Sequence, residues 1–90
     1  GDAEACRTLA WEYATGDKRA QDTARATELF LTGCDKGNAN SCIDLGSLND
    51  WAMFGVAEDK EAARELYVRA CDMGSKVGCD LLDQSLSAAR

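Results

Sequence analysis

Cysteine is the residue type in this chain with the greatest capacity for chemistry, because there are five cysteines among 90 residues and no histidine. A small chain with this many cysteines is typical of a disulfide framework formed in an oxidising compartment, and an odd number leaves one thiol over. The absence of histidine removes the usual general base and the commonest metal ligand. The composition therefore predicts structural disulfides and a secreted or periplasmic location.

The charge of the chain limits its partners. Sixteen acidic and ten basic residues give a formal net charge of −6, and the acidity is spread evenly along the sequence. Nucleic acids and anionic membrane surfaces are poor partners for such a surface. No apolar run approaches the roughly 18 residues of a membrane span, and the N-terminus lacks a basic segment followed by an apolar one. We therefore expect no nucleic-acid partner, no membrane span and no signal peptide within this sequence.

An internal repeat covers the chain. The segment ELFLTGCDKG recurs 37 positions later as ELYVRACDMG. Cys6, Cys42 and Cys79 lie 36 and 37 residues apart, and a leucine follows each of them by three positions. Self-similarity at this period is the signature of a repeat solenoid, in which each unit packs on its neighbours. We predict a single domain, residues 1–90, with repeat units at about 1–37 and 38–74 and a final half-repeat at 75–90.

Each repeat unit has the pattern of two helices. Apolar residues recur at three-four spacing, as at Leu66, Tyr67 and Ala70, which keeps one face of a helix apolar. Asp59 stands at an N-cap position, and Gly74 stands where a left-handed residue ends a helix. No alternating run predicts a strand. The expected fold is an all-α, α/α superhelical solenoid of about two and a half repeats, with five helices at about 2–15, 22–35, 38–52, 59–72 and 75–88.

These residues resemble the Sel-1-like repeat, a relative of the tetratricopeptide repeat. Leu45-Gly46 carries the helix A signature of that family, and Ala63, Tyr67 and Ala70 carry the helix B signature. The resemblance covers essentially the whole chain and is closest to the cysteine-rich subset of the family. It departs from the family pattern in the first and third copies, where the glycine of helix A is replaced by alanine and aspartate.

The resemblance implies how four of the cysteines pair. In the cysteine-rich subset, a cysteine that ends helix B bonds the cysteine in the next helix A, which here implies the disulfides Cys34–Cys42 and Cys71–Cys79. A glycine after each helix B supplies the tight reversal that brings two Cα atoms within disulfide range. Closing so short a loop contributes roughly 2.5 kcal/mol by chain entropy. The expected solenoid is therefore stapled by disulfides.

Cys6 is the cysteine without an expected partner. It stands in the register of Cys42 and Cys79, so its partner would lie eight residues earlier, before the sequence begins. We favour a unit cut from a longer array, and the alternative is a reduced thiol packed as a small hydrophobe. We expect a monomer, with a Cys6-linked dimer as an artefact of non-reducing conditions.

Metal binding and catalysis are the other uses that cysteines and serines could have. Zinc sites need cysteines two to four residues apart, often with histidine, whereas the spacing within each pair is eight. A catalytic thiol needs an adjacent base. The resemblance implies β-lactamase or penicillin-binding activity as an alternative function, but no serine has the lysine three residues later that such a nucleophile uses. We expect no catalytic residue, no metal and no cofactor.

Binding of a protein or peptide is the function that the repeat architecture favours. A solenoid of repeats forms a curved rod with an extended concave face, and the resemblance implies that helix A lines it. We predict a non-catalytic scaffold or adaptor whose partner is neutral or basic. Two alternatives remain: both tryptophans could pack against adjacent helices, or the chain could be a structural fragment without a pocket that folds only in a larger array. The predicted partner-binding residues are Arg7, Trp11, Asn40, Ser47, Asp50, Trp51, Asp80 and Gln84.

Overall fold

Five α-helices and no strand make up residues 2–88, which are the residues that the computed structural model describes. Each helix begins and ends within one residue of its expected bounds, so the predicted all-α fold is confirmed. The helices alternate along the chain between the A and B positions of the repeat. Their bounds are α1 Asp2–Thr15, α2 Thr23–Asp35, α3 Ala39–Trp51, α4 Lys60–Asp72 and α5 Lys76–Ala88.

Short polar side chains start the helices, and two glycines follow the B helices. Asp22, Asn38 and Asp59 each accept a hydrogen bond from the backbone N–H three residues later, which satisfies an amide that has no partner inside the helix. Gly37 and Gly74 both have φ of +95°, a left-handed conformation that glycine adopts without strain. The chain therefore reverses directly after α2 and α4.

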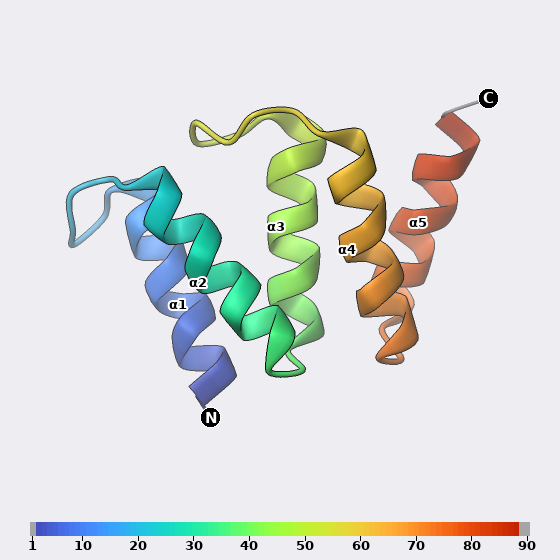
Figure 1. The fold of residues 1–90 in the computed structure, drawn as a ribbon, viewed down its shortest axis with the longest axis horizontal. Helices are drawn as coiled ribbons and strands as arrows, with labels where there is room; N and C mark the ends of the chain where they lie inside the picture. Colours follow the sequence, from blue (N-terminus) through green and yellow to red (C-terminus); the bar gives the residue numbers. More distant parts are fainter. Residues whose placement is uncertain (1, 89–90) are drawn as a thin grey trace.

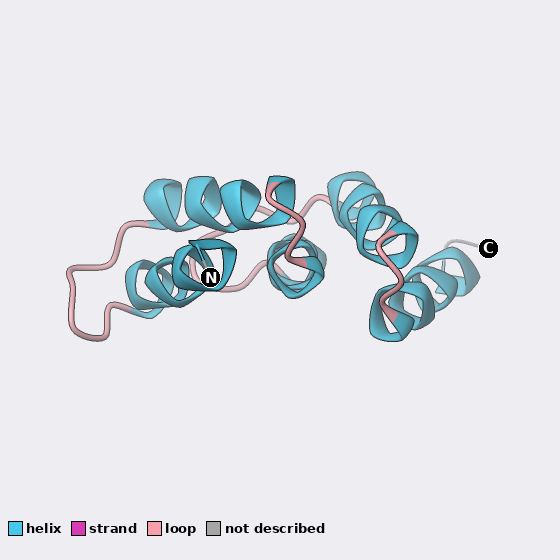
Figure 2. Ribbon diagram, turned by 90° about the horizontal axis from the view of Figure 1, so that it is seen from below, coloured by secondary structure: helices cyan, strands magenta, loops and turns pink. Residues whose placement is uncertain are grey.

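The helices lie in two layers. Figure 1 shows them side by side along the long axis, and the turned view of Figure 2 separates α2 and α4 on one side from α1, α3 and α5 on the other. Within the described residues α3 contacts both α1 and α5, whereas the backbones of α2 and α4 are not in contact. The A helices therefore form a continuous row, as expected for the inner face of a solenoid. The molecule measures 39 × 27 × 14 Å.

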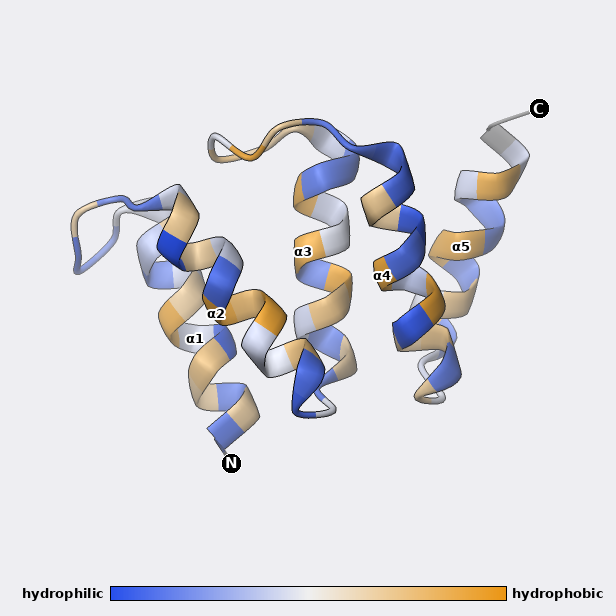
Figure 3. Cartoon of the chain, viewed as in Figure 1, coloured by the Kyte–Doolittle hydropathy of each residue, from blue (hydrophilic) through white to orange (hydrophobic). Residues whose placement is uncertain are grey.

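The core is a thin layer between these helices. Figure 3 shows hydrophobic and hydrophilic residues interleaved along every helix, so each helix has an apolar side to bury. Phe30 of α2 and Tyr67 of α4 are completely buried and occupy equivalent repeat positions. A side chain on Gly46 would place its Cβ 2.8 Å from the Tyr67 ring, which explains why glycine stands there in helix A.

One disulfide joins each B helix to the A helix that follows it. Cys34 bonds Cys42 and Cys71 bonds Cys79, with Cα–Cα distances of 4.7 and 4.5 Å. They are the two pairs that the resemblance implies, and they indicate an oxidising compartment. Cys6 is half-buried and has no disulfide partner among the described residues. None of the described helices is long and apolar enough to cross a membrane.

The loop between α3 and α4 packs back against the first repeat. Thr23, at the start of α2, donates a hydrogen bond from Oγ1 to the carbonyl oxygen of Phe54 at 2.9 Å. The Phe54 ring lies edge-on to Trp11 of α1, with 6.0 Å between ring centroids. Figure 1 shows this loop extending from the top of α3 toward α2. An aromatic side chain from the second repeat thus helps to close the core of the first.

Candidate functional site

An aspartate on α3 accepts hydrogen bonds from two of the predicted partner-binding residues. Arg7 Nε and Trp11 Nε1, both on α1, donate to the same oxygen of Asp44, at 2.5 and 2.9 Å. Arg7 also pairs with Glu4 at 3.0 Å, and its hydrogen bond with Asp44 raises the pKa of the guanidinium. The polar atoms of Arg7 and Trp11 therefore join neighbouring A helices.

The two tryptophans have different surroundings. Trp11 is half-buried and packs edge-on against Phe30, with ring centroids 5.1 Å apart and an interplanar angle of 81°. Trp51, the last residue of α3, is 70% exposed. The alternative in which the tryptophans pack against adjacent helices describes Trp11 and not Trp51.

The remaining predicted residues of the A helices are spread over the three helices. Asn40 and Asp80 are exposed, and Asp80 accepts a hydrogen bond from Lys76 at 3.3 Å. Ser47 is half-buried, and its hydroxyl lies 3.5 Å from the hydroxyl of Tyr67. Among the described residues, neither Asn40 nor Asp80 forms a hydrogen bond with Arg7.

Asp50 is the centre of a second polar cluster, between α3 and α4. Lys60 Nζ donates to the carboxylate of Asp50 at 2.7 Å and to its backbone oxygen at 2.8 Å, which raises the pKa of the ammonium group. The Tyr67 hydroxyl donates to the other carboxylate oxygen at 3.3 Å. Burial, with the negative charge of Asp50, raises the pKa of Tyr67. The ammonium of Lys60 also lies 5.6 Å from the centroid of the Trp51 ring, a cation–π distance.

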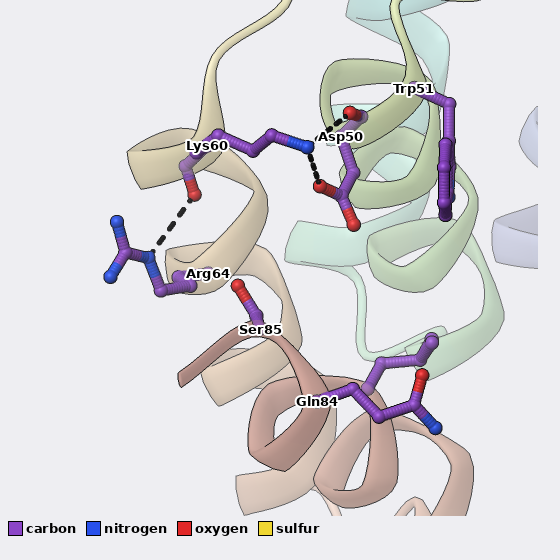
Figure 4. A pocket seen from close by; sticks show the side chains of 7 residues that line it. Asp50, Trp51, Lys60, Arg64, Gln84 and Ser85 are labelled. Carbon is purple, nitrogen blue, oxygen red and sulfur yellow. Dashed lines mark hydrogen bonds and ion pairs between the residues drawn. The ribbon is translucent and has the colours of Figure 1, made fainter. Parts of the chain in front are cut away.

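A pocket of about 340 Å³ opens beside this cluster, between α3, α4 and α5. Figure 4 shows Trp51 extending from the end of α3 toward Gln84 on α5, while Lys60 reaches across to Asp50. The Arg64 guanidinium points away from Trp51, and its Nε donates to the backbone oxygen of Lys60. The lining residues are Asp50, Trp51, Lys60, Arg64, Leu81, Gln84 and Ser85.

Three of the eight predicted residues, Asp50, Trp51 and Gln84, line this one pocket. Sequence reasoning missed Lys60 and Arg64, because only A helices were expected to form the site and these residues lie on a B helix. It also missed Asp44, which lies one residue after Ile43, the repeat equivalent of Arg7. The available signal for that contact was an acid beside the repeat equivalent of Arg7 on the next A helix.

The described residues contain no group of three or more cysteine, aspartate or glutamate side chains placed to hold a metal ion. The polar groups of the pocket can donate and accept hydrogen bonds, and the indole and Leu81 provide apolar area. These properties suit the binding of another chain.

Two solved structures resemble this α/α solenoid. Helicobacter pylori cysteine rich protein B (hcpB) matches with a TM-score of 0.79 and 25% sequence identity, over 89% of this chain and 59% of that one. The protective antigen c5321 of uropathogenic Escherichia coli, which displays an SLR fold, matches with a TM-score of 0.78 and 24% identity, over 91% of this chain and 18% of that one. No family model and no curated protein matches. The chain thus has the SLR fold, that of Sel-1-like repeats, and the resemblance to the cysteine-rich, disulfide-bridged proteins of this type is confirmed.

Proposed function

We propose that the chain is a non-catalytic module that binds a protein or peptide on the face formed by α1, α3 and α5. The observation that carries this proposal is the pocket of about 340 Å³, because residues from two A helices, Asp50, Trp51 and Gln84, converge there. An exposed tryptophan beside a concave surface is the composition of an interface anchor. The amide of Gln84 is suited to bonding the backbone of an extended peptide.

The partner is expected to be neutral or basic, because the chain carries a net charge of −6. The described part of the face is short, so we expect affinities in the micromolar range. The chain spans 59% of the cysteine-rich protein and 18% of the antigen that it matches. We therefore place this module in a longer, secreted or periplasmic array, in which further repeats add to the affinity.

Peptide selection followed by NMR mapping tests the proposal. Peptides selected from a displayed random library on the folded, oxidised protein should shift backbone amides of α3 and α5, of neighbouring α1, and of α4 near Lys60 and Arg64, which line the pocket. They should leave the amides of α2 and of the rest of α4 nearly unchanged. Saturable binding that maps to α2 and to the part of α4 away from Lys60 and Arg64 would contradict the use of this face. The absence of any selected peptide with a dissociation constant below about 1 mM would contradict the function itself, because such affinity is only about 4 kcal/mol.

The non-catalytic part of the proposal has a separate assay. Cysteine-rich Sel-1-like proteins resemble this chain, and β-lactamase activity is the alternative that this resemblance implies. We expect hydrolysis of a chromogenic cephalosporin to be no faster with the oxidised protein than in buffer alone. Hydrolysis that increases in proportion to protein concentration would favour the alternative.

A further inference from the structure

The pocket between α3, α4 and α5 has an equivalent at the first junction, between α1, α2 and α3, and there it is filled. In the repeat register, Ser85 of α5 corresponds to Leu48 of α3, and Lys60 corresponds to Thr23. Leu48 is 1% exposed and belongs to the buried cluster that contains Ala14 and Phe30 of the first repeat, whereas Ser85 lines the open pocket. The exchange of leucine for serine therefore removes a large side chain from this position.

Phe54 shows what kind of group closes the filled junction. Its ring packs on Trp11 and belongs to the partly buried residues around the same cluster. Its backbone oxygen accepts a hydrogen bond from Thr23 Oγ1, in the position that Lys60 occupies at the second junction. The first junction is thus completed by a large uncharged side chain whose backbone is held by the start of the B helix.

The charged residues that line the open pocket are Asp50, Lys60 and Arg64. The ammonium of Lys60 is bonded to Asp50, and the guanidinium of Arg64 points away from Trp51. A charged group placed against the indole and Leu81 would lose hydration there, whereas an uncharged apolar group would cover both. The volume of about 340 Å³ lies at the lower end of small-ligand pockets, a size that fits one large side chain.

We propose that this pocket receives one large uncharged side chain, aromatic or aliphatic, presented by an extended segment of the partner in the way that Phe54 is presented to the first junction. This inference rests on the proposed function and names the anchor of the partner. Lys60 holds the Trp51 ring by its cation–π contact, so the wall of the pocket is formed before the partner arrives.

The protein's own loop supplies a probe. The capped hexapeptide of sequence AMFGVA, which matches residues 52–57, is titrated into 15N-labelled protein in parallel with the same peptide carrying alanine or lysine in place of phenylalanine. We expect a saturable shift of the Trp51 indole N–H signal at millimolar phenylalanine peptide, at least tenfold weaker binding of the other two peptides, and no shift of the Trp11 signal. The Trp51→Phe variant assigns the two signals.

Two variants provide the controls. Ser85→Leu restores the residue of the first junction, fills the pocket and should abolish the Trp51 shift, while the unchanged melting temperature shows that the protein is folded. Val68→Ala, at an exposed residue of α4 outside the pocket, should leave the titration unchanged. Equal shifts with all three peptides, or a full response in Ser85→Leu, would overturn the proposal.

The outcomes separate this inference from the proposed function. If library peptides bind α1, α3 and α5 but neither they nor the probe shift Trp51, the module binds peptides and the anchor pocket is wrong. If the probe binds as expected and no library peptide is found, the pocket stands and the peptide-binding function fails. If a segment attached after residue 90 fills the pocket in cis and blocks the probe, the bound side chain comes from the same chain, and the assignment to a partner is wrong.

Discussion

At the scale of single residues, Tyr67 shows how the repeat combines packing with a polar contact. Its ring lies beside Gly46, where an added Cβ would come within 2.8 Å of it, and the equivalent Phe30 of the first repeat is also completely buried. The hydroxyl that distinguishes Tyr67 from Phe30 reaches Asp50 at 3.3 Å. The hydroxyl oxygen of Tyr67 thus connects the buried core to Asp50, which lines the pocket.

The buried hydroxyl of Tyr67 leads to a prediction about pH. The pKa of Tyr67 is raised by burial, so above pH ~10 the unfolded chain loses this proton while the folded protein keeps it. The unfolded state then binds fewer protons, and the free energy of unfolding should fall as pH rises. Below pH ~10 residue 67 should contribute no slope. Urea unfolding of the wild type and Tyr67→Phe between pH 8 and 11, values chosen to bracket the tyrosine pKa, measures this contribution.

The comparison uses the Cys6→Ser background, because a free cysteine can exchange with the disulfides during unfolding. Tyr67→Phe should be about 1 kcal/mol less stable at pH 8, since it loses a hydrogen bond, and the difference should shrink above pH ~10. Tyr13→Phe is the matched control for removal of a half-buried tyrosine. If the wild type and Tyr67→Phe lost stability in parallel as the pH rises, the pKa of Tyr67 would be the same in the folded and unfolded states, and the prediction would be wrong.

At the scale of elements, each of the two disulfide-bonded junctions has one glycine where its helices approach most closely. In the first junction this glycine lies on the B helix, and in the second it lies on the A helix. Gly33 of α2 faces Ser41 of α3, and a Cβ on Gly33 would lie 2.5 Å from the serine hydroxyl. At the second junction Ala70 of α4 faces Gly78 of α5, and a Cβ on Gly78 would lie 2.7 Å from that of Ala70. The helices approach closely at both junctions because one of the facing residues has no side chain.

This exchange predicts a strong coupling between the two facing residues. Gly78→Ser alone should destabilise the protein by about 1–3 kcal/mol through overpacking, and Ala70→Gly alone by about 1 kcal/mol through lower helix propensity. The double variant reproduces the glycine–serine pair of the first junction and should be more stable than the sum of the two single effects predicts. It keeps the close approach of the new Cβ to the backbone N of Cys71, at 2.9 Å, so only part of the lost stability should return. Urea unfolding of the wild type, the two single variants and the double variant measures the coupling. Strictly additive effects would mean that the contact between residues 70 and 78 does not limit stability.

The two disulfides should differ in their resistance to reduction. Cys34 and Cys42 are completely buried, whereas Cys71 and Cys79 are both partly exposed. A thiolate must reach a sulfur atom to attack it, so the exposed bond should be reduced first. Graded dithiothreitol, trapping by alkylation and mass mapping should reveal a species with Cys71 and Cys79 alkylated and Cys34–Cys42 intact. Simultaneous loss of both bonds would instead indicate that global unfolding precedes reduction.

The local pattern of the sequence predicts most of these elements. Asp22 and Asp59 mark the starts of α2 and α4, and Gly37 and Gly74 mark their ends, because capping and left-handed turns are local effects. The facing pairs of the junctions were not predicted, since Ser41 and Gly78 share a register but differ in their partner across the junction. Three-dimensional complementarity of this kind is not visible in one helix.

At the scale of the whole molecule, the row of A helices was predictable from the repeat, but the position of the pocket was not. Trp11 and Trp51 both lie on A helices, and the sequence assigned both to the partner-binding face. The loop that carries Phe54 covers Trp11, and no equivalent loop within the described residues covers Trp51. The two tryptophans also occupy different repeat positions, since Trp11 aligns with Ser47 and Trp51 aligns with the exposed Thr15. The exposure of each ring thus depends on its place in the helix as well as on the loop of the neighbouring repeat.

The final prediction separates binding from stability across the molecule. Trp51→Ala removes an exposed ring and one cation–π contact, so it should lower the free energy of unfolding by less than about 1 kcal/mol. It should weaken a selected peptide at least about tenfold, because exposed aromatic anchors dominate interfaces of this size. Leu45→Ala, at a buried position of α3, should do the reverse and cost roughly 2–5 kcal/mol with unchanged affinity per folded molecule.

Calorimetric titration at a temperature where both variants remain folded, together with urea unfolding, measures both quantities. Val68→Ala is the control for loss of an exposed apolar side chain away from the pocket. If Trp51→Ala unfolded the protein and left the affinity per folded molecule unchanged, the α1, α3 and α5 face would lose its anchor. The solenoid would stand, because its core residues and disulfides do not depend on Trp51, and the binding surface would have to lie on α2 and α4 or on the loops.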